Sequence, residues 1–321
     1  MTLHLIQSGL LAILFFSGLA ALLSASLYPK VRNNLTRLPC RIRAIILTLW
    51  LLSPAFIGFT LAFFGLLPSW MDSHDIATEH CSSHTNGIAH LCWFDPIVHL
   101  SGALWTGGIS VLASVILFNA YKGIHLLIKH YHFQTTLRLI GQPDRQRGVF
   151  RIASKHFFVF SSGLFTPHAF ISSRLMEQLS AKQLDVVLAH EQAHCRRRDV
   201  LRRLLLSLAA LFHFPGTRQQ LLADLELAHE QICDVAAAQK VGDRFFVAET
   251  IINLARNTTL GYQEQDIGVI AFNGSHIDIR IQQLLEQPKP VNRYAVFFFS
   301  LLFIVLFSGI LALAMPLHHL L

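Results

Sequence analysis

The chain has 321 residues, of which 53% are hydrophobic and only 14% are charged. This composition excludes an ordinary soluble protein and indicates an integral membrane protein. The formal net charge is +7. In a membrane protein such an excess marks the loops that face the cytoplasm, so it is no argument for direct nucleic-acid binding.

Four segments are long and apolar enough to cross a bilayer, which takes about 20 residues. They cover residues 3–27, 45–67, 97–118 and 294–315. We therefore predict an α-helical membrane protein with four transmembrane helices, three before and one after a more polar region. The first segment is a poor signal peptide, because its positive charges follow it instead of preceding it.

The loops between these segments differ sharply in charge. The loop after the first segment has no acid and five basic residues: Lys30, Arg32, Arg37, Arg41 and Arg43. The next loop has no Lys or Arg and four acids: Asp72, Asp75, Glu79 and Asp95. The positive-inside rule then places the N-terminus outside. It predicts a membrane domain over residues 1–120 with an outer loop at 68–96, a cytoplasmic domain over 121–293, and a C-terminal helix with a short outer tail over 294–321.

Residues 121–293 are more polar and predict an α+β domain. Segments rich in aromatic and β-branched residues indicate three strands, at 148–153, 156–162 and 165–172. Pro167 favours an edge position for the third strand, because proline cannot donate a hydrogen bond. Ser180 and Gln183 form a capping-box pattern, so a helix is expected to begin near Ala181. Further helices are expected at 199–214, 218–241, 245–255 and 276–286, and a loop at 256–273.

The predicted helix after Ala181 carries an H-E-x-x-H pattern at residues 190–194. Positions i and i+4 share a helix face, so His190 and His194 project their imidazoles together and can bind one zinc ion. Glu191 is rotated about 100° from His190 and can take a proton from water on that metal. This chemistry hydrolyses peptide bonds. A chain with 18 histidines can also meet so short a pattern by chance, so a further ligand is needed.

A catalytic zinc takes three protein ligands and keeps one position open. Glu230 and Asp234 are again four residues apart and share one face of a predicted helix. We predict Glu230 as the third ligand and Asp234 as the acceptor for the outer N–H of a zinc-bound histidine. Glu226 and His229 are the alternative third ligands.

Residues beside the motif have simpler interpretations. The arginines at 196–198 are expected at a solvated helix end or against anionic lipid head groups, and Asp199 can pair with one of them. Cys195 and Cys233 are expected to point away from the motif residues and to serve packing, since cytosolic thiols are usually reduced.

Two motifs resemble those of the BlaR/MecR-type membrane-embedded zinc metallopeptidases. HEQAHCRRRD at 190–199 is similar to their H-E-x-x-H-x-x-R-x-D, and EQICD at 230–234 is similar to their E-x-x-C/A-D. The segment 163–191 is similar to the stretch that precedes the zinc helix in that family. The resemblance covers most of residues 150–290 and agrees with the membrane flanks.

This resemblance implies a zinc metalloendopeptidase of a bacterial cytoplasmic membrane, with its active site on the cytoplasmic side. It implies one zinc ion per chain, held by His190, His194 and Glu230, with Glu191 as the base. It also implies that 165–172 is an edge strand that holds substrate by strand addition.

In the best-known members of that family, an outside signal activates the protease, which then inactivates a DNA-binding repressor. We therefore expect a protein or peptide substrate, such as a repressor or the protease itself, and a role in signal transduction. Those sensors carry a penicillin-binding domain after the last span, whereas only a few residues follow residue 315 here. No S-x-x-K sequence occurs in the chain, so acylation by a β-lactam is not expected.

The predicted outer loop contains several soft metal ligands. They are His74, His80, Cys81, His84, His90 and Cys92. Imidazole and thiolate suit copper or zinc, so one hypothesis is a metal sensor. The alternative is a Cys81–Cys92 disulfide that closes a polar loop in an oxidising compartment. We favour the disulfide, because the spacing matches no standard metal template.

Two other functions compete with a signalling protease. An HtpX-like membrane protease would share both motifs and act in general quality control. A membrane receptor could instead use the metal site only as a structural element. The number of substrates distinguishes an HtpX-like protease from a dedicated signalling protease. A Glu191→Gln substitution distinguishes either protease from a receptor.

Overall fold

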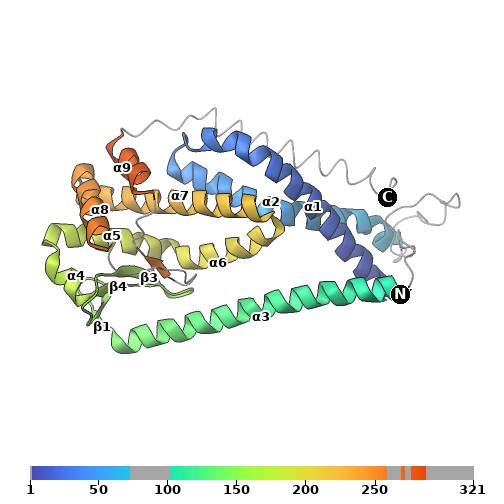
Figure 1. Ribbon diagram of the computed structural model, residues 1–321, viewed down its shortest axis with the longest axis horizontal. Coiled ribbons are helices and arrows are strands. Elements are labelled where there is room, and N and C mark those ends of the chain that lie inside the picture. Colours follow the sequence, from blue (N-terminus) through green and yellow to red (C-terminus); the bar gives the residue numbers. More distant parts are fainter. Residues whose placement is uncertain (1, 73–101, 259–268, 272–275, 287–321) are drawn as a thin grey trace.

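A computed structural model describes residues 2–72, 102–258, 269–271 and 276–286 of the chain. The predicted span at 294–315 and most of the outer loop lie outside these residues, as does the Cys81–Cys92 pair. The described helices and strands are arranged as an elongated molecule, with long helices along its length and a small sheet near one end (Figure 1).

Helices α1 (Thr2–Leu35) and α2 (Cys40–Asp72) form a hairpin. Within the described residues, two segments are long and apolar enough to cross a membrane, namely Ala12–Leu35 and Cys40–Phe64. They cover most of the first two predicted spans. Helix α1 continues past residue 27 to Leu35 and includes Pro29.

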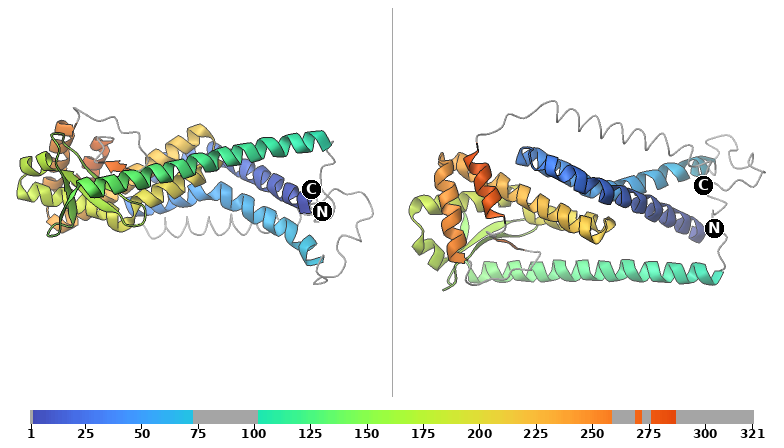
Figure 2. Two further views of the ribbon diagram at one scale, coloured as in Figure 1. Left: turned by 90° about the horizontal axis from the view of Figure 1, so that it is seen from below. Right: turned by 45° about the horizontal axis from the view of Figure 1, so that its top comes forward.

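Helix α3 (Gly102–Ile140) contains 39 residues and includes the described part of the third predicted span. It continues without a break beyond residue 120 and runs from the end that holds the N-terminus to the sheet (Figures 1 and 2). The described residues therefore contain two candidate spans and one further long helix, and four transmembrane helices remain a prediction.

Within the described residues, the sheet has five strands in the order β1-β2-β4-β3-β5. Its strands are β1 (Gln142–Asp144), β2 (Val149–Ile152), β3 (Val159–Ser162), β4 (His168–Ser172) and β5 (Val269–Ala271). Strands β2 and β4 are parallel, and the other neighbours are antiparallel. Strand β5 lies inside the segment that was predicted as a loop, and it pairs with β3.

The predicted edge position of the third strand is wrong. Strand β4 lies between β2 and β3, where it has a partner on each side. Pro167 immediately precedes the first residue of this strand, so its missing N–H removes no hydrogen bond from the ladder. Strand addition of a substrate to β4, which the family resemblance implied, is therefore blocked by its neighbours.

The remaining helices follow the sheet in sequence. They are α4 (Ser173–Gln178), α5 (Ala181–Arg197), α6 (Asp199–Ala209), the 3₁₀ turn η1 (Ala210–Phe212), α7 (Pro215–Val241), α8 (Arg244–Thr258) and α9 (Ile277–Leu285). The predicted capping box at the start of α5 is confirmed. The Ser180 hydroxyl accepts from the Gln183 amide at 3.2 Å, and the Gln183 side chain accepts from the Ser180 amide at 3.0 Å.

Two hydrophobic cores meet along α7. The first packs the sheet against α5 and α8 and includes Ile171, Leu188 and Ile251. The second packs α6 and α7 against the α1–α2 hairpin, with Leu47 of α2 and Leu221 of α7 both fully buried. Helix α7 therefore connects the α1–α2 hairpin to the sheet-containing part of the molecule.

Candidate metal centre

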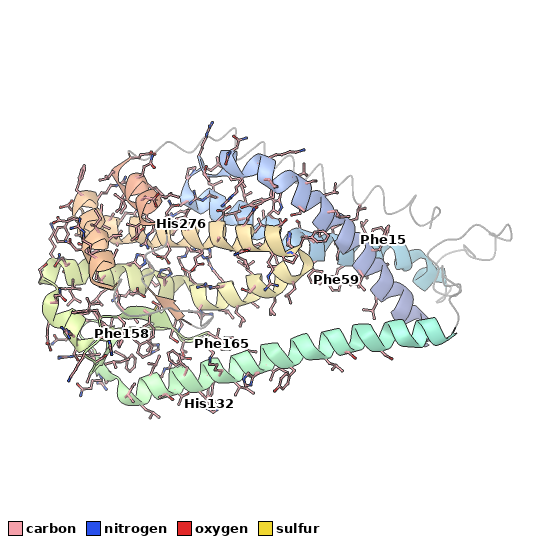
Figure 3. All side chains as sticks on the ribbon, in the orientation of Figure 1. Phe15, Phe59, His132, Phe158, Phe165 and His276 are labelled. Carbon is pink, nitrogen blue, oxygen red and sulfur yellow. The ribbon has the colours of Figure 1, made fainter. Side chains whose placement is uncertain are left out.

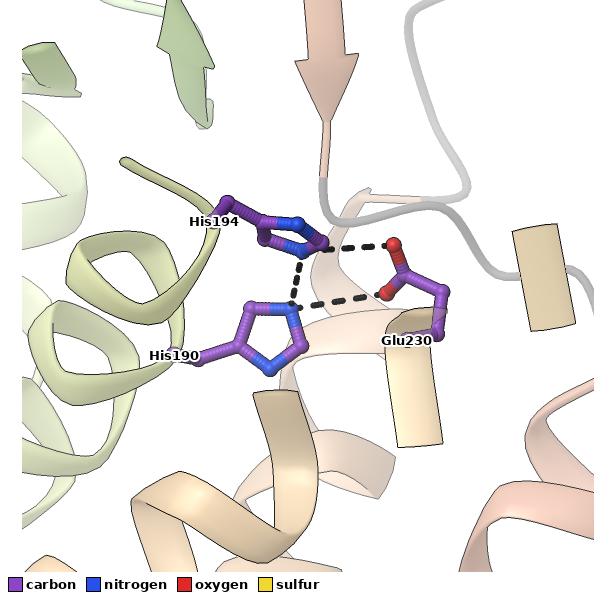
Figure 4. Close-up of side chains that lie close together, drawn as sticks. All are labelled: His190, His194 and Glu230. Carbon is purple, nitrogen blue, oxygen red and sulfur yellow. Dashed lines mark hydrogen bonds and ion pairs between the residues drawn. The ribbon is translucent and has the colours of Figure 1, made fainter. Parts of the chain in front are cut away.

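The two predicted histidines and Glu230 come together where α5 packs against α7 (Figure 4). Nε2 of His190 lies 3.4 Å from Oε2 of Glu230, and Nε2 of His194 lies 3.3 Å from Oε1 of the same carboxylate. The two Nε2 atoms are 3.1 Å apart. All three side chains are buried. Two imidazole nitrogens and one carboxylate, from two helices, thus converge.

The other ring nitrogen of each histidine faces a carboxylate. Nδ1 of His190 lies 3.0 Å from Oδ1 of Asp234, as the sequence predicted. Nδ1 of His194 lies 2.9 Å from Oδ2 of Asp199. Each carboxylate favours the proton on Nδ1, which leaves the Nε2 lone pair directed toward the shared point.

The contact between Asp199 and His194 was not foreseen from the sequence. Asp199 also accepts a hydrogen bond from Nε of Arg197 at 3.1 Å, in agreement with the predicted pairing to one of the arginines. It reaches the histidine because Arg198 adopts a left-handed conformation, with φ of 54°. This residue ends α5 and begins α6, so the chain turns sharply and the Asp199 carboxylate returns to the preceding helix.

Arg280 of α9 is the second residue that the sequence did not reveal. Its side chain is fully buried and donates to both carboxylate oxygens of Asp234, at 2.7 and 2.8 Å. Its Nη1 also lies 3.0 Å from Oε2 of Glu230. One guanidinium therefore contacts both acids of the second motif. Arg280 is 46 residues from Asp234 in the chain, so no local spacing pointed to it.

The charge of Arg280 decides the ionisation of these two acids. Burial by itself raises the pKa of Glu230 and of Asp234, but the nearby guanidinium and the histidines outweigh it. The pKa of Glu230 falls well below its usual range, and that of Asp234 is also lowered. Both carboxylates are thus negatively charged at neutral pH, as a ligand and an orienting acceptor must be.

Glu191 is buried beside this centre, and its two carboxylate oxygens have different surroundings. Ser161 of β3 donates its hydroxyl to Oε2 of Glu191 at 2.6 Å. Oε1 is buried and has no hydrogen-bond partner among the residues that the structure describes. Burial raises the pKa of Glu191, and the two histidines and Ser161 offset this only in part. A carboxylate in this state has an increased affinity for a proton, which a general base requires.

The alternative third ligands lie apart from this centre. Glu226 pairs with Arg203 of α6 at 3.2 Å and is partly exposed. His229 is buried, and burial lowers its pKa to about 4, so its ring is neutral at pH 7. Among the described residues, neither belongs to a group whose ligand atoms converge.

The prediction that Cys233 points away from the motif is wrong. Its Sγ lies 3.9 Å from Oδ2 of Asp199, and together with His194 these residues form a second compact group. Burial raises the pKa of the Cys233 thiol to about 11. At neutral pH it is a weak hydrogen-bond donor to Asp199 and no thiolate ligand. Cys195 is half-buried and contacts the Ser161 hydroxyl at 3.6 Å.

The donor set fits a catalytic zinc ion. Two imidazole nitrogens and one carboxylate oxygen are the ligands of many zinc peptidases, and two ligands about 2.1 Å from a tetrahedral ion are about 3.4 Å apart. Here the two Nε2 atoms lie 3.1 Å apart, and each lies 3.3 to 3.4 Å from one of the two oxygens of Glu230. The free oxygen of Glu191 adds a buried acceptor beside them.

The donor set and the nearby Glu191 are those of a metallopeptidase centre. A family model described as Peptidase family M48 matches residues 130–264 of the chain. The match includes both motifs, Asp199 and Ser161, and it ends before Arg280. It supports the prediction of a metalloprotease, whereas the narrower BlaR/MecR-type assignment stays a prediction. Comparison with curated proteins finds no match to the chain.

Proposed function

We propose that this chain is a membrane-bound zinc endopeptidase whose active site faces the cytoplasm. One observation carries the proposal: His190, His194 and Glu230 converge, with 3.1 to 3.4 Å between the nearest nitrogen and oxygen atoms of their side chains. The neighbouring Glu191 is buried, and its Oε1 has no hydrogen-bond partner among the described residues. The match of residues 130–264 to Peptidase family M48 supports the same chemistry.

The residues of this centre have separate proposed roles. His190, His194 and Glu230 would hold one zinc ion, which when bound supplies a Lewis acid that polarises the scissile carbonyl and acidifies water. Asp234 and Asp199 hold the protons of the two imidazoles on Nδ1. Arg280 keeps Glu230 and Asp234 ionised.

Glu191 is the proposed base. Its Oε1 takes a proton from the attacking water and passes it to the leaving amine, while the Ser161 hydroxyl holds Oε2 in place. Glu191, the three ligand side chains and Arg280 are all buried, so the carboxylate lies in an environment of low dielectric constant. This environment strengthens each of the charge interactions described above.

The proposed membrane arrangement rests on the candidate spans and on charge. The segments Ala12–Leu35 and Cys40–Phe64 meet at a basic end, where five Lys or Arg residues lie between positions 30 and 43. Two further spans are predicted at 97–118 and 294–315. With the N-terminus outside, the basic region and the metallopeptidase domain lie on the cytoplasmic side. In this arrangement the protein is permanently inserted in the lipid bilayer.

We further propose a signalling role in which the protease cleaves a regulatory protein, such as a DNA-binding repressor, and also itself. The support is the resemblance of residues 190–199 and 230–234 to the BlaR/MecR-type motifs. Quality-control proteolysis of the HtpX type is the rival role, and it predicts many misfolded substrates in place of one dedicated substrate.

A Glu191→Gln substitution in the full-length protein tests the enzymatic proposal. We expect the purified variant to keep one zinc ion per chain by elemental analysis, and to lose cleavage of itself and of other proteins. The matched control is Glu177→Gln, an exposed carboxylate that pairs with Arg151 outside the centre. Normal cleavage by Glu191→Gln would refute the proposed mechanism.

Comparison of the proteomes of cells that carry the active protein or Glu191→Gln tests the role. A dedicated protease leaves one or a few uncleaved proteins in the variant, and a repressor among them would support signalling. A broad accumulation of misfolded membrane proteins would instead support quality control. Identical proteomes with identical cell behaviour would favour a receptor with a structural metal site.

A further inference from the structure

The segment that connects α6 to α7 lies inside the region predicted as cytoplasmic, yet it packs against the candidate spans. We define the tip hairpin as residues 204–217, which include the end of α6, η1 and the start of α7. His213 in this hairpin contacts Ser24 of α1 and the backbone carbonyl of Leu51 of α2, each at 3.2 Å. The tip hairpin therefore reaches both helices of the α1–α2 hairpin.

The contacts of the hairpin give its depth along these helices. Ser24 is six residues, or about 9 Å of helix, from Lys30, the first exposed cation at that end of α1. Leu51 is eight residues, or about 12 Å, from Arg43 of α2. The Phe212 ring lies 6.5 Å from that of Phe59, which is farther along α2 (Figure 3). Three contacts thus place the tip well beyond the basic end of the spans.

The composition of the tip hairpin suits a hydrocarbon environment. Residues 204–217, with the sequence LLLSLAALFHFPGT, contain no Asp, Glu, Lys or Arg. Four large apolar side chains in and beside it are at least 45% exposed: Leu205, Leu208, Leu211 and Phe214. The nearest cation after the tip, Arg218, has a long side chain that can extend toward lipid head groups.

The imidazole of His213, the one titratable side chain of the tip hairpin, has its polar partners within the protein. The His213 ring has a partner at each nitrogen, and the Ser24 hydroxyl that it contacts accepts a further hydrogen bond from Trp50 Nε1 at 2.8 Å. Pro215 contributes no backbone N–H at the turn into α7. A segment that enters a bilayer must satisfy its polar groups in this way, because lipid tails offer no hydrogen bonds.

We propose that the tip hairpin is a re-entrant membrane element, inserted among the lipid acyl chains of the cytoplasmic leaflet beside α1 and α2. Lipid is the occupant because the exposed apolar face of the tip continues onto exposed apolar residues of both candidate spans at the same level. These include Leu22 and Leu23 of α1 and Phe56 and Phe59 of α2. The exposed face of the tip hairpin thus extends the proposed lipid-facing surface of α1 and α2.

The insertion has a consequence for the metal centre. Asp224 of α7, which pairs with Arg32 near the end of α1, lies six residues from Glu230, or about 9 Å of helix. The inserted tip therefore holds the metal centre close to the cytoplasmic face of the bilayer. The protease can then reach segments of substrate that lie near the membrane.

A fluorescent amino acid introduced at position 211 of the full-length protein tests the insertion. The protein is placed in lipid nanodiscs of phosphatidylethanolamine and phosphatidylglycerol, and quenching is measured with acyl-chain nitroxide lipids and with aqueous iodide. The matched control is position 245, where Phe245 of α8 is also an exposed aromatic residue, 72% accessible, and far from the tip. A second label at position 208 guards against local distortion.

We expect the nitroxide lipids to quench the label at 211 several-fold more than the label at 245, and iodide to show the opposite order. Iodide quenching at 211 equal to that at 245 would overturn the proposal, because the tip would then lie in water. Protection of 211 from both quenchers would also overturn it, because a second copy or the segment 294–315 would then cover the tip.

Discussion

The two halves of α7 have the same helical geometry but very different surroundings. The half that begins at Pro215 packs leucines against the α1–α2 hairpin, with few polar pairs. The half that contains Glu230 and Asp234 faces two histidines and a buried arginine. An apolar contact stabilises the fold in proportion to the area that it buries, so small changes of side chain are tolerated. A buried charge that loses one of its partners is strongly destabilising. We therefore expect substitutions to be far more damaging in the second half.

One contact joins the α1–α2 hairpin to the second half of α7. Arg43 of α2 is buried and donates a hydrogen bond to the side chain of Gln231, the residue next to Glu230. Farther along, Asp224 accepts hydrogen bonds from Tyr28 and Arg32 of α1. The α1–α2 hairpin is thus linked through polar contacts to the helix that carries Glu230.

The largest expected effect is that of Arg280→Met. The substitution leaves Glu230 and Asp234 buried without their guanidinium, which typically costs about 3–5 kcal/mol. Thermal unfolding of the purified protein in detergent measures the loss, and zinc content should fall as well. The control is Arg151→Met, which removes a mostly exposed pair with Glu177 and should cost less than about 1 kcal/mol. Equal losses in both variants would contradict the comparison.

Asp199→Asn and Asp234→Asn sharpen the comparison within the metal centre. Each removes the charge that orients one histidine, so we expect zinc affinity to fall about 10–100-fold in each variant. Asp234→Asn should have the larger effect, because it also weakens the contact with Arg280. Competition with a zinc chelator measures both affinities. Asp185→Asn, at an exposed position of the same α5 helix, is the control and should bind zinc normally.

A smaller effect is expected for Ser161→Ala. The Ser161 hydroxyl stabilises the ionised form of Glu191 and so lowers its pKa. Without it the pKa rises, and the acid limb of the pH profile of kcat/KM moves to higher pH. The variant should therefore lose more activity at low pH than at high pH. Ser173→Ala is the control, because Ser173 pairs with Arg151 outside the centre. An unshifted acid limb would exclude this role of Ser161.

The smallest effect is expected at the membrane end of α7, for Arg32→Gln. The pair with Asp224 has good geometry, with Nε to Oδ2 at 2.6 Å, but the arginine side chain is 42% exposed. Such pairs typically contribute about 1 kcal/mol or less. Thermal unfolding under the conditions used for Arg280→Met tests this. A loss as large as that of Arg280→Met would show that the two halves of α7 do not differ as proposed.

The features that the sequence determined by itself depend on residues close together in the chain. Apolar run length predicted the segments over α1 and α2, a capping box predicted the start of α5, and four-residue spacing predicted the shared faces of His190 with His194 and of Glu230 with Asp234. Helical geometry relates these residues directly, since their relative positions depend on a few backbone angles.

Other features were decided only by tertiary structure. Strand β4 became central because β2 pairs with it in parallel, although Pro167 favoured an edge. Arg280 and Ser161 reached the metal centre from α9 and β3, and the tip hairpin came to lie beside α1 and α2. These contacts join residues 30 to 189 positions apart. No local periodicity encodes such distant pairs, because they depend on how whole elements pack.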